Sequence, residues 1–149
     1  SVKERNKIAE LVDNSIKAGA KVLTGGKTPD GPGAFYPATV LEVDKQAEIL
    51  NHEVFGPVAP VVVFDTDAEA IELANSTDFG LISYVYSENL KRAIQISEAI
   101  ESGMVAINRG LISDPAAPFG GVKQSGLGRE GGFDGIHEFL ETKYIGVEI

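Results

Sequence analysis

The alternation of apolar and polar positions along the chain predicts an ordered series of helices and strands. The first helix has one apolar face at helical spacing, formed by Ile8, Leu11, Val12 and Ile16. We expect it to end near Gly19, because glycine is a common helix stop, and to be followed by a short strand at 22–23. A Pro/Gly-rich stretch at 28–33 is typical of a surface loop, and 35–43 contains the next strand.

Three apolar segments separated by two helical patterns occupy the middle of the chain. We expect strands at 58–64, 81–86 and 104–107, the first of them buried. Thr66-Asp67-Ala68-Glu69 has the sequence of a capping box for the first helix, and Ser87 can cap the second. The expected inward faces are Ala70, Ile71 and Ala74, and Leu90, Ala93, Ile94, Ser97 and Ile100. This order predicts two βαβ units, hence an α/β fold with a mostly parallel sheet and flanking helices.

The pattern breaks between Asn108 and Gly132, where glycine is frequent and periodicity is weak. Loops this long in compact domains are usually functional or disordered, and the apolar residues of this one indicate an ordered, packed loop. A short helix is expected within 132–140. The segment 142–149 alternates well enough to be a strand, which would need a neighbour in its own sheet or in another subunit.

Composition narrows the class of protein. Hydrophobic residues make up 43% and charged residues 23% of the 149 residues, which is typical of a globular chain. The net charge is 13 − 22 = −9, which argues against nucleic acid and anionic membrane surfaces as partners. The absence of cysteine excludes a disulfide framework and fits a cytoplasmic protein. A chain that starts at Ser1, inside a helical pattern, is expected to be a piece of a longer one.

Six short motifs follow one another along the chain. They are Lys21-Val22-Leu23-Thr24-Gly25-Gly26, Glu53-Val54-Phe55-Gly56-Pro57, Asn75-Ser76-Thr77-Asp78-Phe79-Gly80-Leu81, Gly103-Met104-Val105-Ala106-Ile107-Asn108, Pro118-Phe119-Gly120-Gly121 and Ser125-Gly126-Leu127-Gly128-Arg129-Glu130. In this order they resemble the aldehyde dehydrogenase superfamily over nearly the whole chain. The resemblance implies that 1–140 is the C-terminal part of a catalytic domain and 141–149 an oligomerisation strand, so that the partners are an aldehyde and further copies of the protein.

Glu53 and Phe55 are the cofactor-binding pair that this resemblance implies. A carboxylate can hold two ribose hydroxyls, and an aromatic ring two residues on, at the same side of an extended segment, can brace the nicotinamide of NAD or NADP. From the residues alone, a solvated glutamate and a core phenylalanine remain an alternative.

The segment from Gly110 to Gly131 looks most similar to the succinate semialdehyde dehydrogenases of the superfamily. By this resemblance Ser113 helps to bind the distal carboxylate of the substrate, and Phe119 is an aromatic wall of the aldehyde pocket. The arginines that would share the carboxylate are expected upstream of this chain. A loop serine bonded to its own backbone and a core phenylalanine remain alternatives.

Arg129 and Glu141 are implied to join a buried charge network near the subunit interface, with two solvated charges as the alternative. The segment 126–131 matches Gly-x-Gly-x-x-Gly, but it follows a loop and too little chain remains to complete a βαβ unit, so we do not interpret it as a dinucleotide fingerprint. His52 and His137 lack metal-ligand spacing, and no metal site is expected.

The resemblance implies an enzyme that oxidises an aldehyde, with succinate semialdehyde favoured, to the acid. Its nucleophilic cysteine, its general-base glutamate and its oxyanion-hole asparagine are all expected upstream of Ser1, so the isolated chain is expected to be inactive. Three alternatives stay open: a non-catalytic assembly fragment, a small nucleotide-binding module, and a dehydrogenase for another semialdehyde or for a broad range of aldehydes.

Overall fold

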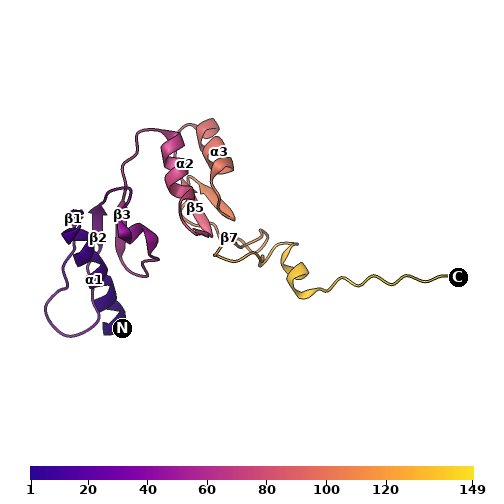
Figure 1. Ribbon diagram of the computed structural model, residues 1–149, viewed down its shortest axis with the longest axis horizontal. Helices are drawn as coiled ribbons and strands as arrows, with labels where there is room; N and C mark the ends of the chain where they lie inside the picture. Colours follow the sequence, from indigo (N-terminus) through magenta and orange to yellow (C-terminus); the bar gives the residue numbers. More distant parts are fainter. The chain divides into compact units, whose positions relative to one another are not determined.

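The computed structural model describes residues 1–149, and the chain divides into two compact units, Ser1–Asp65 and Thr66–Ile149. Each unit combines helices with small sheets, as Figure 1 shows, so the α/β class is confirmed. The units are described separately below.

The first unit packs a helix and a 3-10 turn beside a three-stranded sheet. Helix α1 (Val2–Lys17) is capped by Ser1, whose side chain accepts a hydrogen bond from the Glu4 amide. The strands are β1 (Lys21–Thr24), β2 (Thr39–Glu42) and β3 (Val58–Val61), with the 3-10 helix η1 (Glu48–Asn51) between the last two. Strand β2 is central, antiparallel to β1 and parallel to β3.

The core of this unit brings together the buried residues of α1, β2, η1 and the segment between them, namely Val12, Leu41, Val43 and Ile49. Helix α1 ends at Ala18, and Gly19 with φ of 106° turns the chain toward β1, as the sequence predicts. Gly25 is required at the end of β1, since a Cβ atom there would lie 2.3 Å from the Ala38 carbonyl oxygen.

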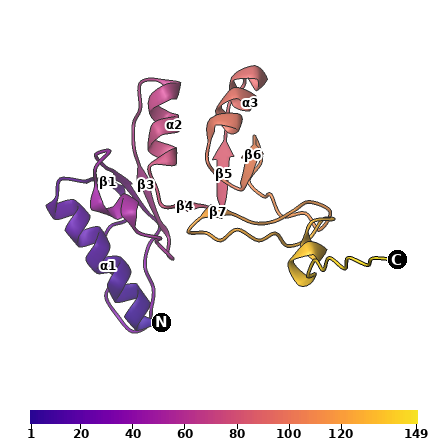
Figure 2. The ribbon, with the colours of Figure 1, turned by 45° about the vertical axis from the view of Figure 1, so that its right-hand side comes forward.

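The second unit contains one parallel strand pair joined by a helix. Helix α2 (Asp67–Asn75) is followed by β4 (Phe79–Gly80), β5 (Ile82–Val85), α3 (Leu90–Ala99) and β6 (Met104–Ile107). Strands β5 and β6 are parallel, with Ile82 opposite Met104, and α3 connects them (Figure 2). This confirms the second of the two predicted βαβ units.

The long loop is ordered by pairing with other parts of the unit. Strand β7 (Val122–Lys123) is antiparallel to β4, and Phe119 forms an isolated bridge with Glu130. The 3-10 helix η2 (Gly135–Phe139) follows, shorter than the helix expected within 132–140. The pairing agrees with an ordered loop, but the predicted packing is only partial, because Leu111 and Leu127 are 68% and 81% exposed.

Helix caps agree with the sequence at one of two places. The Thr66 side chain accepts a hydrogen bond from the Glu69 amide and begins α2, as predicted. At α3 the predicted cap Ser87 is wrong, because the helix begins two residues later and Asn89 accepts from the Arg92 amide. The Ser87 hydroxyl accepts from the Asn89 amide and so stabilises the turn before the cap.

The predicted helix faces are partly wrong. Ala93 is buried, and the residues that are half-buried are Ala70, Ile71, Ser97 and Ile100. The remaining members of the two faces, Ala74, Leu90 and Ile94, are exposed. The 3.6-residue period identifies which side chains share a helix face, but the width of the covered face depends on what packs against it.

The first predicted βαβ unit would join the two compact units and stays a prediction, since β3 pairs with β2 within the first unit and β5 with β6 within the second. Strand β3 is an edge strand rather than a buried one, and Val63, which follows it, is 64% exposed. Apolar patterning identifies a strand without specifying its neighbours, and an edge strand is covered on fewer sides.

The C-terminal segment 141–149 has no regular secondary structure, and its side chains are exposed. A strand requires a partner to which its amides and carbonyls can bond. The oligomerisation strand therefore stays a prediction for the assembled protein.

Candidate functional site

Glu53 and Phe55 lie in the segment between η1 and β3 of the first unit. Both line one cavity of about 380 Å³, whose other wall is the face of α1 that includes Ile8 and Leu11. The helix approaches this segment closely at Gly56, where a Cβ atom would lie 2.3 Å from the Ile8 Cδ1 atom. The structure thus brings the two predicted cofactor residues to the same cavity.

The chemistry of this pair suits a polar ligand with a flat ring. Glu53 is exposed, so both carboxylate oxygens can accept hydrogen bonds. Phe55 is 81% exposed, which contradicts the alternative that it is a core residue of this chain. A ligand that covers an exposed aromatic ring removes apolar surface from water, which lowers the free energy.

His52 lies next to this pair, and its Nε2 atom is 3.1 Å from the Glu48 Oε1 atom. Both side chains are at least half exposed. No group of three or more His, Cys, Asp or Glu side chains is arranged to hold a metal ion. The pair is therefore an exposed contact within η1 and its cap.

The long loop leaves the sheet of the second unit at Asn108, whose φ is 53°. Its side chain accepts a hydrogen bond from the Ser87 amide and donates one to the Ser87 carbonyl, both at 2.9 Å. Sequence reasoning did not find this role. An asparagine directly after a strand was the available signal, because asparagine tolerates positive φ better than most residues.

Ser113 and Phe119 lie at two points of this loop. Ser113 is exposed, and its neighbours Ile112 and Asp114 line a cavity of about 200 Å³ together with Phe119. Phe119 is half-buried and also lines a larger cavity of about 780 Å³ that η2 helps to enclose. The structure thus brings Phe119 and the two neighbours of Ser113 to one cavity, which Ser113 itself does not line.

The position of Phe119 is fixed by its backbone. Its amide and carbonyl both bond to Glu130 at 2.7 Å. The next residue, Gly120, lies against Gly103 at the start of β6, where a Cβ atom would be 2.0 Å from the Gly120 carbonyl oxygen. Only glycine at 103 allows this approach, so the loop sits directly on the sheet.

Arg129 is held within the loop. Its Nη1 atom donates to the carbonyls of Gly121, Leu127 and Gly128 at 2.7, 3.2 and 3.0 Å, and its amide donates to Glu138. Glu141 is exposed and makes no ion pair with Arg129. The buried charge network between them stays a prediction. The 126–131 segment lies between β7 and η2, which is not the setting of a dinucleotide fingerprint.

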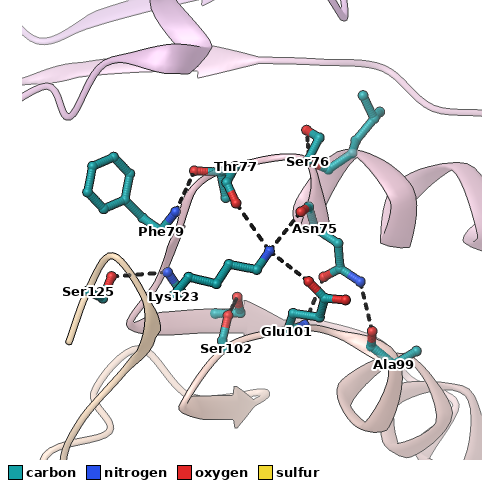
Figure 3. Close-up of polar contacts among 12 residues, drawn as sticks. Asn75, Ser76, Thr77, Phe79, Ala99, Glu101, Ser102, Lys123 and Ser125 are labelled. Carbon is teal, nitrogen blue, oxygen red and sulfur yellow. Dashed lines mark hydrogen bonds and ion pairs between the residues drawn. The ribbon is translucent and has the colours of Figure 1, made fainter. Parts of the chain in front are cut away.

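A second polar cluster in this unit was not found from the sequence. Lys123 Nζ lies within 3.1 Å of three acceptors, the carbonyls of Asn75 and Thr77 and the carboxylate of Glu101 (Figure 3). Lys123 and Asn75 are 48 residues apart, so no local pattern could have indicated the contact.

Three titrating groups outside these cavities have shifted pKa values. Hydrogen bonds from the Arg92 guanidinium, helped by its charge, lower the pKa of Asp67 and raise that of Arg92, so the pair joins the start of α2 to α3. Burial, and then the charge of Asp13, raise the pKa of the Tyr36 phenol, against a smaller opposing effect of Thr39.

None of the helices has the length and apolarity needed to cross a membrane.

Residues 1–145 match the sequence profile described as the aldehyde dehydrogenase family. The chain belongs to this family.

Curated relatives include proteins named for semialdehydes. The succinate-semialdehyde dehydrogenase of Paenarthrobacter nicotinovorans is 54% identical over 144 residues, which is 96% of this chain and 32% of that protein. The glutarate-semialdehyde dehydrogenase of Pseudomonas putida is 46% identical, over 96% of this chain and 30% of that protein. A succinate-semialdehyde dehydrogenase of Escherichia coli, named with NADP(+), is 44% identical over 93% and 29%.

Solved structures of the same kind share the fold. The succinate-semialdehyde dehydrogenase of Burkholderia pseudomallei matches with a TM-score of 0.85 and 43% identity, over 92% of this chain and 29% of that one. PnpE in complex with nicotinamide adenine dinucleotide, a protein of Pseudomonas sp. WBC-3, matches with a TM-score of 0.88 and 42% identity, over 95% and 30%. The chain thus spans about a third of the length of the relatives that it matches.

Proposed function

We propose that this chain is the C-terminal part of an NAD(P)-dependent dehydrogenase that oxidises succinate semialdehyde to succinate. The observation that carries the proposal is one cavity, which is lined by Phe119 and by the neighbours of Ser113, Ile112 and Asp114. An aromatic wall suits the carbon chain of a small aldehyde, and a nearby hydroxyl can donate a hydrogen bond to a carboxylate at its far end. The names of the three relatives specify succinate semialdehyde or glutarate semialdehyde, each an aldehyde that also bears a carboxylate.

Glu53 and Phe55 are the residues that would hold the cofactor. Their fit rests on their joint position at one cavity, with the carboxylate and the ring both exposed. When bound, NAD or NADP supplies the acceptor of the hydride. Glu53 would accept hydrogen bonds from ribose hydroxyls, and Phe55 would restrict the orientation of the ring beside it.

The chain does not provide the nucleophile of the reaction. It has no cysteine, and the family resemblance places the thiolate, the general base and the oxyanion-hole amide in upstream sequence. We therefore infer that the 149 residues bind and orient, and that chemistry requires the remainder of the enzyme.

The substrate assignment is tested with Ser113→Ala in the full-length enzyme that contains this chain. We expect the wild type to prefer succinate semialdehyde over butanal, which has the same chain length and no carboxylate. The loss of a hydrogen bond to a charged group should lower kcat/KM for succinate semialdehyde about tenfold. The value for butanal should change less than about twofold. A wild type without this preference, or equal losses for both aldehydes, would remove the substrate assignment.

We also propose that residues 142–149 act as an oligomerisation strand, in a protein that works as a homo-oligomer. The apolar side chains of this segment are exposed in the single chain, including Tyr144 at 91%. Pairing with another subunit would bond their backbone groups and cover the side chains. Deletion of 142–149 should lower the molar mass measured by light scattering, and an unchanged mass would contradict the proposal.

The alternative of a non-catalytic assembly fragment is favoured by the missing cysteine and the exposed apolar tail. It predicts that the chain occurs in cells without upstream sequence. Mass spectrometry of the intact native protein distinguishes the two, since the dehydrogenase requires a chain about three times as long.

A further inference from the structure

Lys123 has a backbone conformation that a lysine rarely adopts. Its φ is 56°, and Asn108 is the other non-glycine residue with positive φ. Asparagine tolerates a positive φ because its short polar side chain can form local hydrogen bonds with the backbone, whereas the long lysine side chain forms none. Contacts elsewhere must therefore stabilise this conformation at Lys123.

The ammonium group of Lys123 makes these contacts. Its Nζ atom donates to the carbonyls of Asn75 at 2.8 Å and Thr77 at 3.1 Å, and lies 2.7 Å from the Glu101 Oε2 atom (Figure 3). An ammonium has three donors, and three acceptors surround it. Asn75 is the last residue of α2, where a positive charge is favoured by the helix dipole. The side chain is 24% exposed, so solvent screens this group only partly.

Asn75 extends the cluster to the end of α3. Its Nδ2 atom donates to the Ala99 carbonyl at 2.9 Å, and its Oδ1 atom accepts from the Glu101 amide at 2.8 Å (Figure 3). The cluster of Lys123, Asn75 and Glu101 therefore joins the ends of both helices to β7.

The same region holds the long loop of residues 108–132, called the substrate loop below, against β4. Lys123 pairs with Phe79 in the β4–β7 ladder, and the Ser125 hydroxyl accepts from the Gly80 amide at 3.0 Å. Phe119 is four residues before Lys123 in the loop, and the intervening Gly120 lies against Gly103. A displacement of Lys123 would therefore be transmitted through a short, closely packed stretch to the ring of Phe119.

We propose that Lys123 is a positioning residue for the aldehyde pocket. Its ammonium group fixes the loop that carries Phe119. The proposal rests on the proposed function, since it takes Phe119 as a wall of that pocket. The polar partners of Lys123, namely Asn75, Thr77 and Glu101, all lie in the compact unit that contains Phe119. The loss of Lys123 should therefore affect the aldehyde and not the cofactor.

The test uses the full-length enzyme with Lys123→Met, Lys123→Arg and the control Lys91→Met, on an exposed position of α3. The measured quantities are KM for succinate semialdehyde, KM for the cofactor, and Tm. Misplacement of a pocket wall should make Lys123→Met raise the aldehyde KM about tenfold, with the cofactor KM within about twofold. Lys123→Arg should recover most of the loss because it restores the cation, and Lys91→Met should match the wild type. Equal rises of both KM values, or a lower Tm with an unchanged aldehyde KM, would overturn the proposal.

Two further variants, Glu101→Gln and Phe119→Ala, complete the test. If Lys123→Met does not fold, Glu101→Gln removes one partner and should raise the aldehyde KM alone, by about threefold. No change in Glu101→Gln would then overturn the proposal. Phe119→Ala distinguishes a failure of the role proposed for Lys123 from a failure of the proposed aldehyde pocket. A raised aldehyde KM in Phe119→Ala but not in Lys123→Met rejects the role of Lys123, whereas no effect in either rejects the proposed pocket as well.

Discussion

At the scale of single residues, the candidate sites combine side chains that the sequence identified with others that it did not. Glu53 and Phe55 were predicted from one motif and line one cavity, as is expected of side chains only two positions apart in an extended segment. Lys123 and Asn108 were missed as contact-forming residues, because their partners Asn75 and Ser87 are distant in sequence. A single sequence shows residue type and spacing but not long-range hydrogen bonds.

The role of Glu53 gives a prediction for cofactor binding. Glu53→Gln in the full-length enzyme keeps the size of the side chain and removes its charge. We expect the cofactor KM to rise about tenfold, because a neutral amide oxygen accepts weaker hydrogen bonds than a carboxylate, while the aldehyde KM is unchanged. Glu72→Gln, on the exposed surface of α2, is the matched control. An unchanged cofactor KM in steady-state assays would exclude Glu53 from the cofactor site.

Tyr36 gives a prediction for the dependence of stability on pH. Its buried hydroxyl makes no well-formed hydrogen bond, and the nearby Thr39 side chain only partly offsets the rise in pKa that burial causes. A raised folded-state pKa means that the contribution of the neutral phenol is fully present below the unfolded pKa. This contribution is lost as the pH rises through the folded value. Alkaline solution should therefore destabilise the wild type more than Tyr36→Phe.

Urea unfolding at pH 8 and above pH 10 measures this difference. At pH 8, Tyr36→Phe should be as stable as the wild type or more stable by up to about 1 kcal/mol, since it removes a buried group without a well-formed hydrogen bond. Tyr144→Phe, in the exposed tail, is the control. A Tyr36→Phe protein that follows the wild type at both pH values would contradict the role assigned to the hydroxyl.

At the scale of elements, the sequence predicted strands and helices better than their pairing. Helix α1 and the β5–α3–β6 unit follow from apolar spacing and short connections, which are local properties. The predicted cap of α3 was wrong, because the cap depends on competition between Ser87 and Asn89. The pairing of β3 with a strand of the second unit stays a prediction. Such choices are made by tertiary contacts rather than by propensity.

The close approach of the substrate loop to β6 gives a prediction at this scale. Gly103→Ala places a methyl group 2.0 Å from the Gly120 carbonyl oxygen, so the loop must move away from the strand. We expect a loss of about 1–3 kcal/mol in the free energy of unfolding, together with a raised aldehyde KM. In Gly110→Ala the nearest atom to the new methyl group is the Tyr86 hydroxyl at 3.6 Å, so the same assays should show little change. Equal stability of the two variants would show that the loop does not require this contact.

At the scale of the whole molecule, the chain spans about a third of the length of the relatives that it matches, and we infer that it supplies only part of a catalytic site. The absence of cysteine and the six ordered motifs, both visible in the sequence, already indicate this. The family profile and relatives about three times as long agree with it. The behaviour of residues 142–149 could not be derived from one chain, since a strand at a subunit interface is specified by the partner that it meets.

The most direct measurement of the central claim is NAD(P)H formation with succinate semialdehyde, by the 149-residue chain and by the full-length enzyme under the same conditions. The account predicts formation by the full-length enzyme and none by the chain, because the nucleophile lies outside these residues. Turnover by the cysteine-free chain, or no turnover of any aldehyde by the full-length enzyme, would contradict it.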